Sequence, residues 1–296
     1  MADYKKSGFT LLEVSIVMVI IGLVIGGVLI GRDLIESSTA RSQVTQIEQY
    51  RTAVHVFKDK YDYLPGDILQ TSALAAGLVR DTLGCAPFCG NGNGLIDCQE
   101  DFPTEYCNRQ QGEATTFWQD LSSAGLIQGT FSTGLSNTST EKTENLLPKA
   151  KIGDGFYLSA ATGGIIVPFN DNNNYFFLAY NSGQCNGSSA GHCIFSDKIK
   201  VIIAANIDKK ADDGLPNSGK TQAFYSSGLS PVWAGHDYAA TGHGYADEVT
   251  NTPKTDANYN GNSTSCYYNR NPTAQPMQYA TKTNANNRNC ALSFQF

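Results

Sequence analysis

The stretch KKSGFTLLEVSIVMVIIGLVIGGVLIG, Lys5 to Gly31, decides the fold of this chain. Its eighteen residues from Val14 to Gly31 carry no charge. At about 1.5 Å rise per residue, a helix of this length nearly spans a hydrocarbon core of about 30 Å. The stretch is therefore predicted to be a membrane helix.

The order of features around this helix differs from that of an ordinary secretory signal, which places its cleavage site behind the apolar run. Here the small residue Gly8 comes before the run and ends the short basic segment MADYKKSG. A cut after Gly8 would remove residues 1–8 as a leader and keep the membrane helix. The mature chain would then begin at Phe9.

The residues GFTLLE, Gly8 to Glu13, resemble the class III signal of type IV pilins and type II secretion pseudopilins. The resemblance implies that a prepilin peptidase cuts after Gly8 and N-methylates Phe9. It also implies that the Glu13 carboxylate meets the terminal ammonium of a neighbouring subunit inside a filament. An ionised side chain in a membrane is expensive and usually marks a function or a partner, which agrees with that role. The alternative is a signal anchor whose Glu13 lies near enough to the interface to stay hydrated.

The composition of the rest of the chain is that of a globular head, and its charge argues against nucleic acid as a partner. The chain has 296 residues, 41% of them hydrophobic and 16% charged, which suits one large or two small globular domains. Its formal net charge of -6 is opposite to that of a phosphate-binding surface. All eight cysteines lie beyond residue 84, on the side that the membrane helix would place in an oxidising compartment, so disulfides are predicted.

The membrane helix is predicted to continue outward into the head. Residues 32–64 contain neither Gly nor Pro. Apolar residues there recur with a 3-4-3-4 spacing that puts them on one face of a helix: Ile47, Tyr50, Val54, Phe57 and Tyr61. One helix is expected from about Phe9 to about Lys60, with Pro65 and Gly66 as the stop signal.

Four glycines, Gly22, Gly26, Gly27 and Gly31, lie in the membrane helix, where each weakens helix propensity by about 1 kcal/mol relative to Ala. Close packing against another helix through small residues is one interpretation. The pilin resemblance implies the other, a segment that unwinds when subunits leave the membrane for the filament.

The head is predicted to mix helices and strands. Short helices are expected over 115–127 behind a Thr cap and over 196–210 behind a Ser cap, with a strand as the alternative for the second because its Val-Ile-Ile run is β-branched. Strands are expected over 155–161, 163–169 and 174–180. Together with the resemblance, this predicts an α+β pilin-like fold: residues 9–31 in the membrane or filament core, residues 32–64 as the outer half of the helix, and residues 65–296 as a head built on an antiparallel sheet.

Two loops carry oxygen-rich side chains that suit calcium, which accepts six to eight oxygens in loose geometry. The first loop gathers Asp208, Asp212, Asp213 and Asn217 where a helix should end. Its alternative is plain helix termination with solvated Asp residues. The second loop, a weaker candidate, carries Asn91, Asn93 and Asp97 among glycines. Its alternative is an ordinary tight turn, since Asn and Gly are turn residues.

The cysteines suggest disulfides rather than zinc. The first four are spaced C-x3-C-x8-C-x8-C, which fits no compact zinc motif and leaves three possible pairings: Cys85, Cys89, Cys98 and Cys107. Cys185 and Cys193 flank a Gly- and Ser-rich loop and are expected to close a small hairpin. Cys266 and Cys290 enclose 23 residues near the C-terminus, a placement that resembles the disulfide-bounded variable loop of type IV pilins.

The sequence offers little support for catalysis. None of the four histidines lies within an HExxH or GxSxG motif. His236 and His243, with Asp237 nearby, are a conceivable metal or hydrolase site, but a glycine-rich surface loop is the default interpretation.

The expected function is structural. The chain would be an inner-membrane prepilin that becomes a subunit of a periplasmic or cell-surface filament of the type IV pilus kind. Its partners would be other copies, other pilins or pseudopilins, the prepilin peptidase and the inner-membrane assembly machinery. The alternatives are a minor pseudopilin of type II secretion and, with less support, a membrane-tethered enzyme or binding module.

Overall fold

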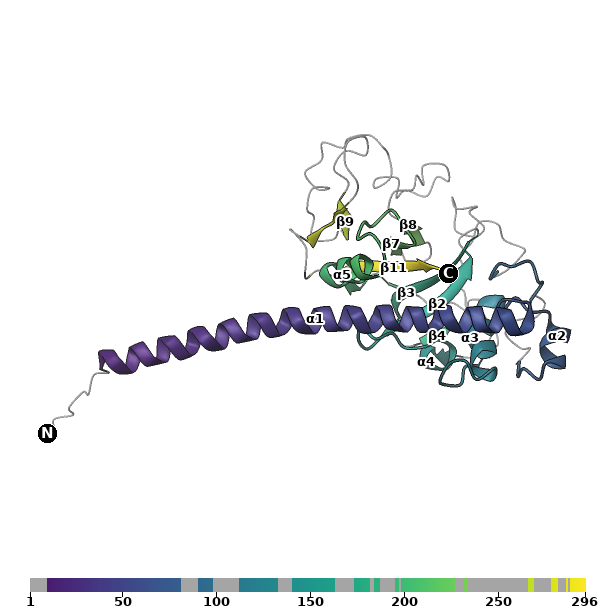
Figure 1. The fold of residues 1–296 in the computed structure, drawn as a ribbon, viewed down its shortest axis with the longest axis horizontal. Helices are drawn as coiled ribbons and strands as arrows, with labels where there is room; N and C mark the ends of the chain where they lie inside the picture. The colour runs from purple at the N-terminus through teal and green to yellow at the C-terminus, as the bar shows by residue number, and fades with distance from the viewer. Residues whose placement is uncertain are drawn as a thin grey trace.

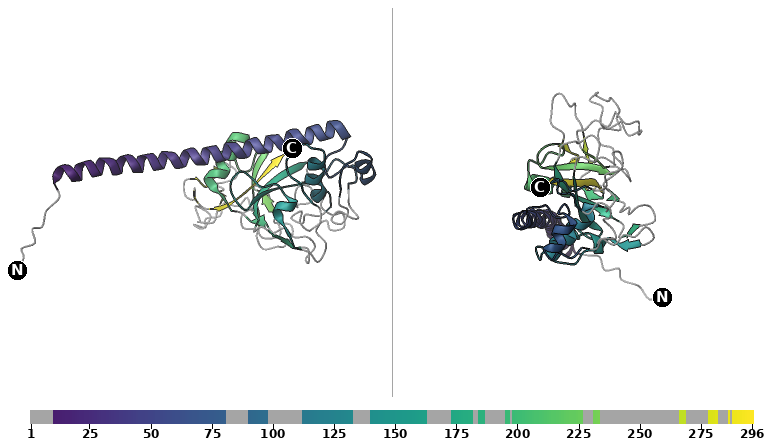
Figure 2. Two further views of the ribbon diagram at one scale, coloured as in Figure 1. Left: turned by 90° about the horizontal axis from the view of Figure 1, so that it is seen from below. Right: turned by 90° about the vertical axis from the view of Figure 1, so that its right-hand side faces the viewer.

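The computed structural model consists of one long helix with a head packed along its outer half (Figure 1). It describes residues 10–80, 90–97, 112–132, 140–162, 173–181, 184–186, 195–196, 198–226, 231–233, 266–268, 278–281, 286 and 288–296. The inner half of the helix projects from the head (Figure 1), and the left view of Figure 2 shows most of the head on one side of the outer half. The predicted α+β fold, a long helix and an antiparallel sheet, is confirmed.

Helix α1 runs unbroken from Leu11 to Tyr61, close to the predicted bounds. It ends before Pro65 and Gly66, because Asp62 takes a left-handed backbone conformation with φ 61° and its N–H donates to the carbonyl oxygen of Lys58 at 2.8 Å. The predicted stop signal therefore lies beyond the actual end of the helix. Lys58 and Lys60 in the last turn stabilise this end, because their positive charges interact favourably with the negative end of the helix dipole.

The outer half of α1 is amphipathic, and its apolar stripe faces the head. Ile47, Val54 and Phe57 are 0–2% exposed, and Tyr50 and Tyr61 pack partly buried beside them. This is the face that the 3-4-3-4 spacing predicts. Two glutamines on the same side, Gln43 and Gln46, are also buried, which the apolar pattern does not reveal.

The head is built on one large antiparallel sheet with strand order β2-β3-β11-β7-β8, to which β5 and β6 add short pairings. Two small ribbons, β1-β4 and β10-β9, lie outside it. The strands are β1 Thr140–Lys142, β2 Phe156–Thr162, β3 Asn174–Asn181, β4 Gln184–Asn186, β5 Phe195–Ser196, β6 Ile199–Lys200, β7 Thr221–Ser226, β8 Pro231–Trp233, β9 Tyr267–Tyr268, β10 Gln278–Tyr279 and β11 Arg288–Gln295. The short helices are α2 Gln70–Ala75, α3 Glu113–Ser123, α4 Thr143–Leu146 and α5 Val201–Ala211.

The centre of the core is aromatic and joins α1, α3 and the sheet. Trp118 of α3 lies with its ring centroid 5.0 Å from Tyr50 of α1 and 5.8 Å from Phe176 of β3. Phe176 in turn stacks on Phe296 at 4.2 Å, next to the end of β11. Such pairs add to the free energy gained by burial, by about 0.5–1.5 kcal/mol each. The role of Trp118 is therefore packing.

Several local predictions need correction. Helix α3 begins at Glu113 behind Gly112, two residues before the expected Thr cap, and no side chain caps it. Helix α5 confirms the helical alternative over 196–210, but it begins at Val201 behind Lys200, because the two preceding residues form β6 against β11. The strand expected over 163–169 lies outside the described residues.

A buried ion pair fixes the chain segment that follows α1. The side chains of Arg80 and Asp120 are 0% exposed, and Asp120 Oδ2 lies 2.5 Å from Arg80 Nη2. Asp120 also accepts from the Gly66 amide at 2.7 Å, while Arg80 donates to the Ile68 carbonyl oxygen at 2.9 Å. Gly66 has φ 87°, and a Cβ added there would lie 2.5 Å from the Glu113 carbonyl oxygen, so only glycine fits at this contact.

We expect Arg80→Met to lower the free energy of unfolding by about 3–5 kcal/mol, because it leaves the Asp120 charge buried without a counter-ion. Urea denaturation of the full chain in detergent would measure the loss. The control is Lys149→Met, which breaks an exposed pair with Glu144 and should cost at most about 1 kcal/mol. The double variant Arg80→Met/Asp120→Leu should recover part of the loss. Equal losses in the two single variants would contradict the structural role of the buried pair.

Candidate functional site

The N-terminus of α1 holds Glu13 in a capping box. Thr10 is the N-cap residue, and its hydroxyl accepts from the Glu13 amide at 3.3 Å. The Glu13 carboxylate reaches back and accepts from the Thr10 amide at 2.8 Å and from the Thr10 hydroxyl at 2.9 Å. Glu13 thus satisfies helix-end donors that would otherwise lack partners. The predicted processing residues, Gly8 and Phe9, lie outside the described residues.

The inner half of α1 has no protein cover. Its large apolar side chains between Leu11 and Ile35 are 45–89% exposed. Among the described residues, this is the one helix long and apolar enough to cross a membrane. The four glycines lie within its continuous helix, and a Cβ added at any of them would meet nothing within 4 Å. Helix packing and unwinding therefore both stay open as explanations of these glycines.

The loop from Gly90 to Asp97 is organised around a buried carboxylate that the sequence analysis missed. Asp67, 1% exposed, accepts from the amides of Gly92, Asn93 and Gly94 at 2.7–3.1 Å. Asn93 donates its side-chain amide to Asp97 at 2.8 Å. Asp67 follows the helix by only a few residues, and no spacing in the sequence links it to a loop more than twenty residues later.

A second buried carboxylate reaches the same loop from α3. Glu113, 1% exposed, accepts from the Asn91 amide at 2.9 Å and from the Asp97 amide at 2.8 Å. Burial raises the pKa of Glu113 to about 8, and the neighbouring carboxylates of Asp67 and Asp97 contribute to the rise. Burial likewise raises the pKa of Asp67. Two buried carboxylates, Asp67 and Glu113, therefore contact the loop on which the sequence predicted only Asn91, Asn93 and Asp97.

The described side chains include no ready-made metal group of three or more His, Cys, Asp or Glu residues. In the Gly90–Asp97 loop, both carboxylate oxygens of Asp67 and of Glu113 accept amide hydrogens. A carboxylate offers about four lone-pair positions, so these bonds leave acceptor capacity for a cation. Calcium, which tolerates loose oxygen geometry, is the metal that this donor set suits.

The other predicted calcium loop is stabilised by its own carboxylates. Asp212 accepts from the amides of Lys220 and Thr221, and Asp213 accepts from the Leu215 amide at 2.8 Å and the Ser218 hydroxyl at 2.6 Å. These contacts close the turn after α5, as expected of helix termination. The Oδ1 atom of Asn217 is buried without a hydrogen-bond partner.

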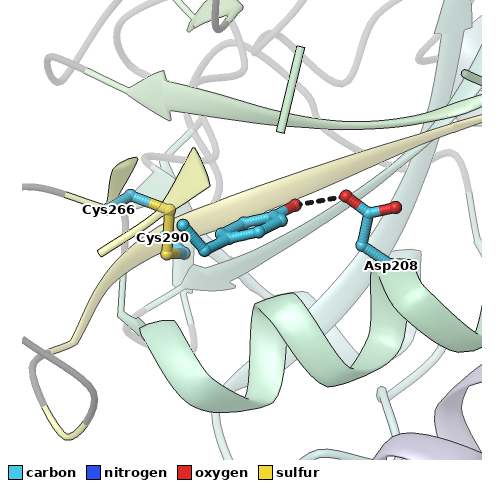
Figure 3. Close-up of a disulfide and its surroundings, with 4 residues drawn as sticks. Asp208, Cys266 and Cys290 are labelled. Carbon is cyan, nitrogen blue, oxygen red and sulfur yellow. Dashed lines mark hydrogen bonds between the residues drawn. A yellow bond between two sulfur atoms is a disulfide. The ribbon is translucent and has the colours of Figure 1, made fainter. Parts of the chain in front are cut away.

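Asp208 differs from the solvated residue that the alternative interpretation expected. It is 0% exposed on α5 and accepts from the Tyr279 hydroxyl at 2.7 Å and the Gly214 amide at 3.2 Å. Burial raises the pKa of Asp208 to about 7. Figure 3 shows the hydrogen bond of this carboxylate as a dashed line, with the bonded ring lying between Asp208 and the Cys266–Cys290 disulfide. The hydrogen bond therefore ties α5 to the segment that the predicted and confirmed disulfide encloses.

The remaining predicted residues add little. His55 is exposed on α1. Cys185 lies in β4, which pairs with β1, and its side chain is outside the described set. Outside the described residues also lie Cys85, Cys89, Cys98, Cys107, Cys193, His192, His236, Asp237 and His243.

The N-terminal geometry agrees with the comparison to known proteins. Residues 3–29 match the family described as the prokaryotic N-terminal methylation motif. The chain therefore carries the signature of type IV pilins and pseudopilins, substrates of prepilin peptidase that are structural subunits. No curated protein and no solved structure matches the chain.

In the presence of a chelator, we expect the stability of the head to fall as pH rises from about 4 to about 8. The reason is that the folded state holds protons on Asp208 and Glu113, with pKa values of about 7 and about 8, that the unfolded chain releases near 3.8 and 4.5. This contribution is fully present below the unfolded values and is lost as pH passes the folded values. Thermal melting in EDTA across this range would measure it.

Two variants separate the contributions. Glu113→Gln should flatten the slope between pH 7 and 8, although absolute stability falls because an amide nitrogen cannot accept the loop N–H. Asp208→Asn should flatten the slope below pH 7 and leave the upper part. A wild-type melting temperature that rises over this range would contradict both assignments.

Proposed function

We propose that this chain is a structural subunit of an extracytoplasmic filament of the type IV pilus kind, assembled from the inner membrane after cleavage behind Gly8. The observation that carries the proposal is an apolar half-helix with no protein cover, opening on Glu13 within a methylation motif. Before assembly the bilayer covers this half. In the filament, the anchors of neighbouring subunits cover it.

Glu13 favours the assembled state over the single chain in the membrane. In the single chain its carboxylate accepts two hydrogen bonds from Thr10, which reduces the free-energy cost of keeping a charge in the apolar segment. The capping box supplies no opposite charge. The ammonium of Phe9 on an adjacent subunit would supply one, and the attraction is stronger in a low-dielectric filament core than in water. A single chain in the membrane does not make this attraction. It is gained only when a second subunit joins.

A minor pseudopilin of type II secretion is the second candidate, because the described head is large. The retained Glu13 argues against the tip-most pseudopilin, which in that family typically lacks the acidic residue. A membrane-tethered enzyme has less support, since the motif is that of structural subunits. The abundance of the chain in sheared filaments separates a major from a minor subunit.

We expect Glu13→Ala to leave membrane insertion and cleavage intact and to reduce filament yield by at least about tenfold, which corresponds to a loss of about 1.4 kcal/mol per added subunit. Insertion should persist because removing a charge makes the segment more apolar. A shear-and-pellet assay at equal membrane levels of processed protein measures the yield.

Intact-mass measurement provides the control for this experiment. Wild type and variant should both begin at Phe9 with one added methyl group, because Gly8 and Phe9 are unchanged. Asp33→Ala removes an exposed carboxylate just beyond the apolar run and should leave yield unchanged. Wild-type yield from a correctly processed Glu13→Ala chain would show that Glu13 is not needed for assembly.

We also propose that the Gly90–Asp97 loop binds calcium. What supports it over the loop after α5 is that two buried carboxylates, Asp67 and Glu113, join the loop from different parts of the chain. Burial is the main cause of the raised pKa of Glu113, and repulsion from the carboxylates of Asp67 and Asp97 adds to the rise. A divalent cation would remove that repulsion. The loop after α5 is the alternative site, through Asp208, Asp212, Asp213 and Asn217.

Calcium at about one hundred times its dissociation constant should stabilise the head by about 2.7 kcal/mol, and EDTA should reverse the gain. Asp97→Asn should abolish the calcium-dependent rise in melting temperature if the Gly90–Asp97 loop is the site. Asp213→Asn, at an exposed carboxylate of the other loop, should keep it. The reverse pattern would assign calcium to the loop after α5, and unchanged melting in all three proteins would contradict calcium binding.

A further inference from the structure

The head begins only a short distance beyond the apolar run of α1. The run ends at Gly31, and the Lys200 ammonium from the head lies 3.1 Å from Glu36 of the helix. Five residues of helix cover about 7.5 Å. The headgroup layer on each side of a bilayer is about 5–7.5 Å thick, since the whole bilayer measures about 40–45 Å and its core about 30 Å. With Gly31 at the hydrocarbon boundary, this ion pair lies at the outer edge of the headgroups.

Three basic side chains gather at this end of the head. Lys200 in β6 pairs in register with Arg288, the first residue of β11. Lys198 lies two residues earlier, with its ammonium 4.1 Å from the ring centroid of Tyr180 near the end of β3. Figure 1 shows α5, which follows Lys200 directly, at the end of the head nearest the projecting helix. Arg32 of α1, just beyond the apolar run, adds a fourth cation.

These four side chains, Arg32, Lys198, Lys200 and Arg288, form what we call the basic collar. Among the described residues two acidic side chains lie near them, Asp33 and Glu36, so these six residues carry +2, while Asp197, which precedes Lys198 in the sequence, lies outside the described residues. The turn before β2 adds one charge of each sign. The whole chain, in contrast, carries -6. The positive charge at the membrane-facing end is therefore a local feature that the net charge conceals.

The neighbouring helix surface favours lipid over a soluble partner. Leu34 and Ile35 are 70% and 66% exposed, although they lie beyond Arg32 and inside the headgroup layer. An acidic peptide would pair with the cations but leave these two side chains in water. A lipid surface covers both, because its phosphates meet the charges while its glycerol and upper acyl regions meet the apolar groups.

We propose that the end of the head nearest the anchor rests on the bilayer and that the basic collar binds the phosphates of anionic phospholipids. The inference rests on the membrane-anchored state proposed above. Because the ion pair of Lys200 with Glu36 fixes the head to the helix at this level, the contact orients the whole subunit on the membrane before assembly. Anionic lipid thereby stabilises the stored subunit.

Lysine footprinting of the full chain in nanodiscs tests the contact. Acylation by a water-soluble ester is followed by mass spectrometry in phosphatidylglycerol discs and in phosphatidylcholine discs. We expect Lys198 and Lys200 to react about threefold more slowly in phosphatidylglycerol at low salt. The difference should vanish at about 0.5 M NaCl, where the screening length falls to about 4 Å. Lys58 and Lys60, exposed at the far end of α1, are internal references and should react equally in both lipids.

Variants give a second readout. Lys198→Gln/Arg288→Gln removes half of the collar and should reduce the lipid dependence of labelling at Lys200, whereas Lys58→Gln/Lys60→Gln should not. Equal labelling of an inserted wild-type chain in the two lipids would overturn the proposal. A chain that fails to co-purify with discs of either lipid would instead contradict the membrane-anchored state itself.

Discussion

The surroundings of helix α1 differ between its two halves, and the rest of the structure depends on that difference. From Leu11 to Ile35 its apolar side chains point in all directions and have no protein neighbours. From Ala40 to Phe57 most apolar side chains occupy one face and are buried against the head, with Val56 exposed. Because the helix is continuous, whatever covers its first half also determines where its second half and the attached head lie. A head built around the first half would leave nothing for a bilayer or a filament neighbour to cover.

Directional contacts fix how the head lies on the helix. Burial of Ile47 or Phe57 alone would permit sliding, since hydrophobic contacts are not directional. Gln43 instead accepts from the Lys151 amide at 2.7 Å, and Gln46 donates to the Lys149 carbonyl oxygen at 2.8 Å. Arg51 donates to the Gln295 carbonyl oxygen at the end of the central strand. An unmade bond at a buried glutamine costs about 1–3 kcal/mol, so these bonds set a single register.

The acidic loops illustrate two different uses of a carboxylate. Asp212 and Asp213 are exposed and close a turn, which requires only acceptors for nearby amides. Asp67 and Glu113 are both buried at one loop, and burial is the main cause of the raised pKa of each carboxyl, with repulsion from neighbouring carboxylates adding to it. The two carboxylates accept from different amides of the loop, so both are needed to close it. The proposed calcium would in addition offset their negative charges.

The sequence by itself determined the features that repeat along one helix or within a few residues. An uncharged run, a GFTLLE signature and a 3-4-3-4 spacing are local patterns, and they predicted α1, its membrane half and its buried face. They also predicted the cores of β2, β3 and α5. The caps of α3 and α5 were wrong because Glu113 and the β6 pairing, both tertiary contacts, decide where those helices begin.

Only the tertiary structure decided which distant polar groups meet. Arg80 and Asp120 are 40 residues apart, Asp208 and Tyr279 are 71 apart, and Asp67 joins a loop 25 to 27 residues away. No periodic pattern in the sequence predicts contacts at such separations, because each contact results from how the helices and the sheet pack. The same holds for the positive end of the head, where Lys200 meets Glu36 across 164 residues. Side-chain spacing fixed the helix, whereas packing fixed the charges that surround it.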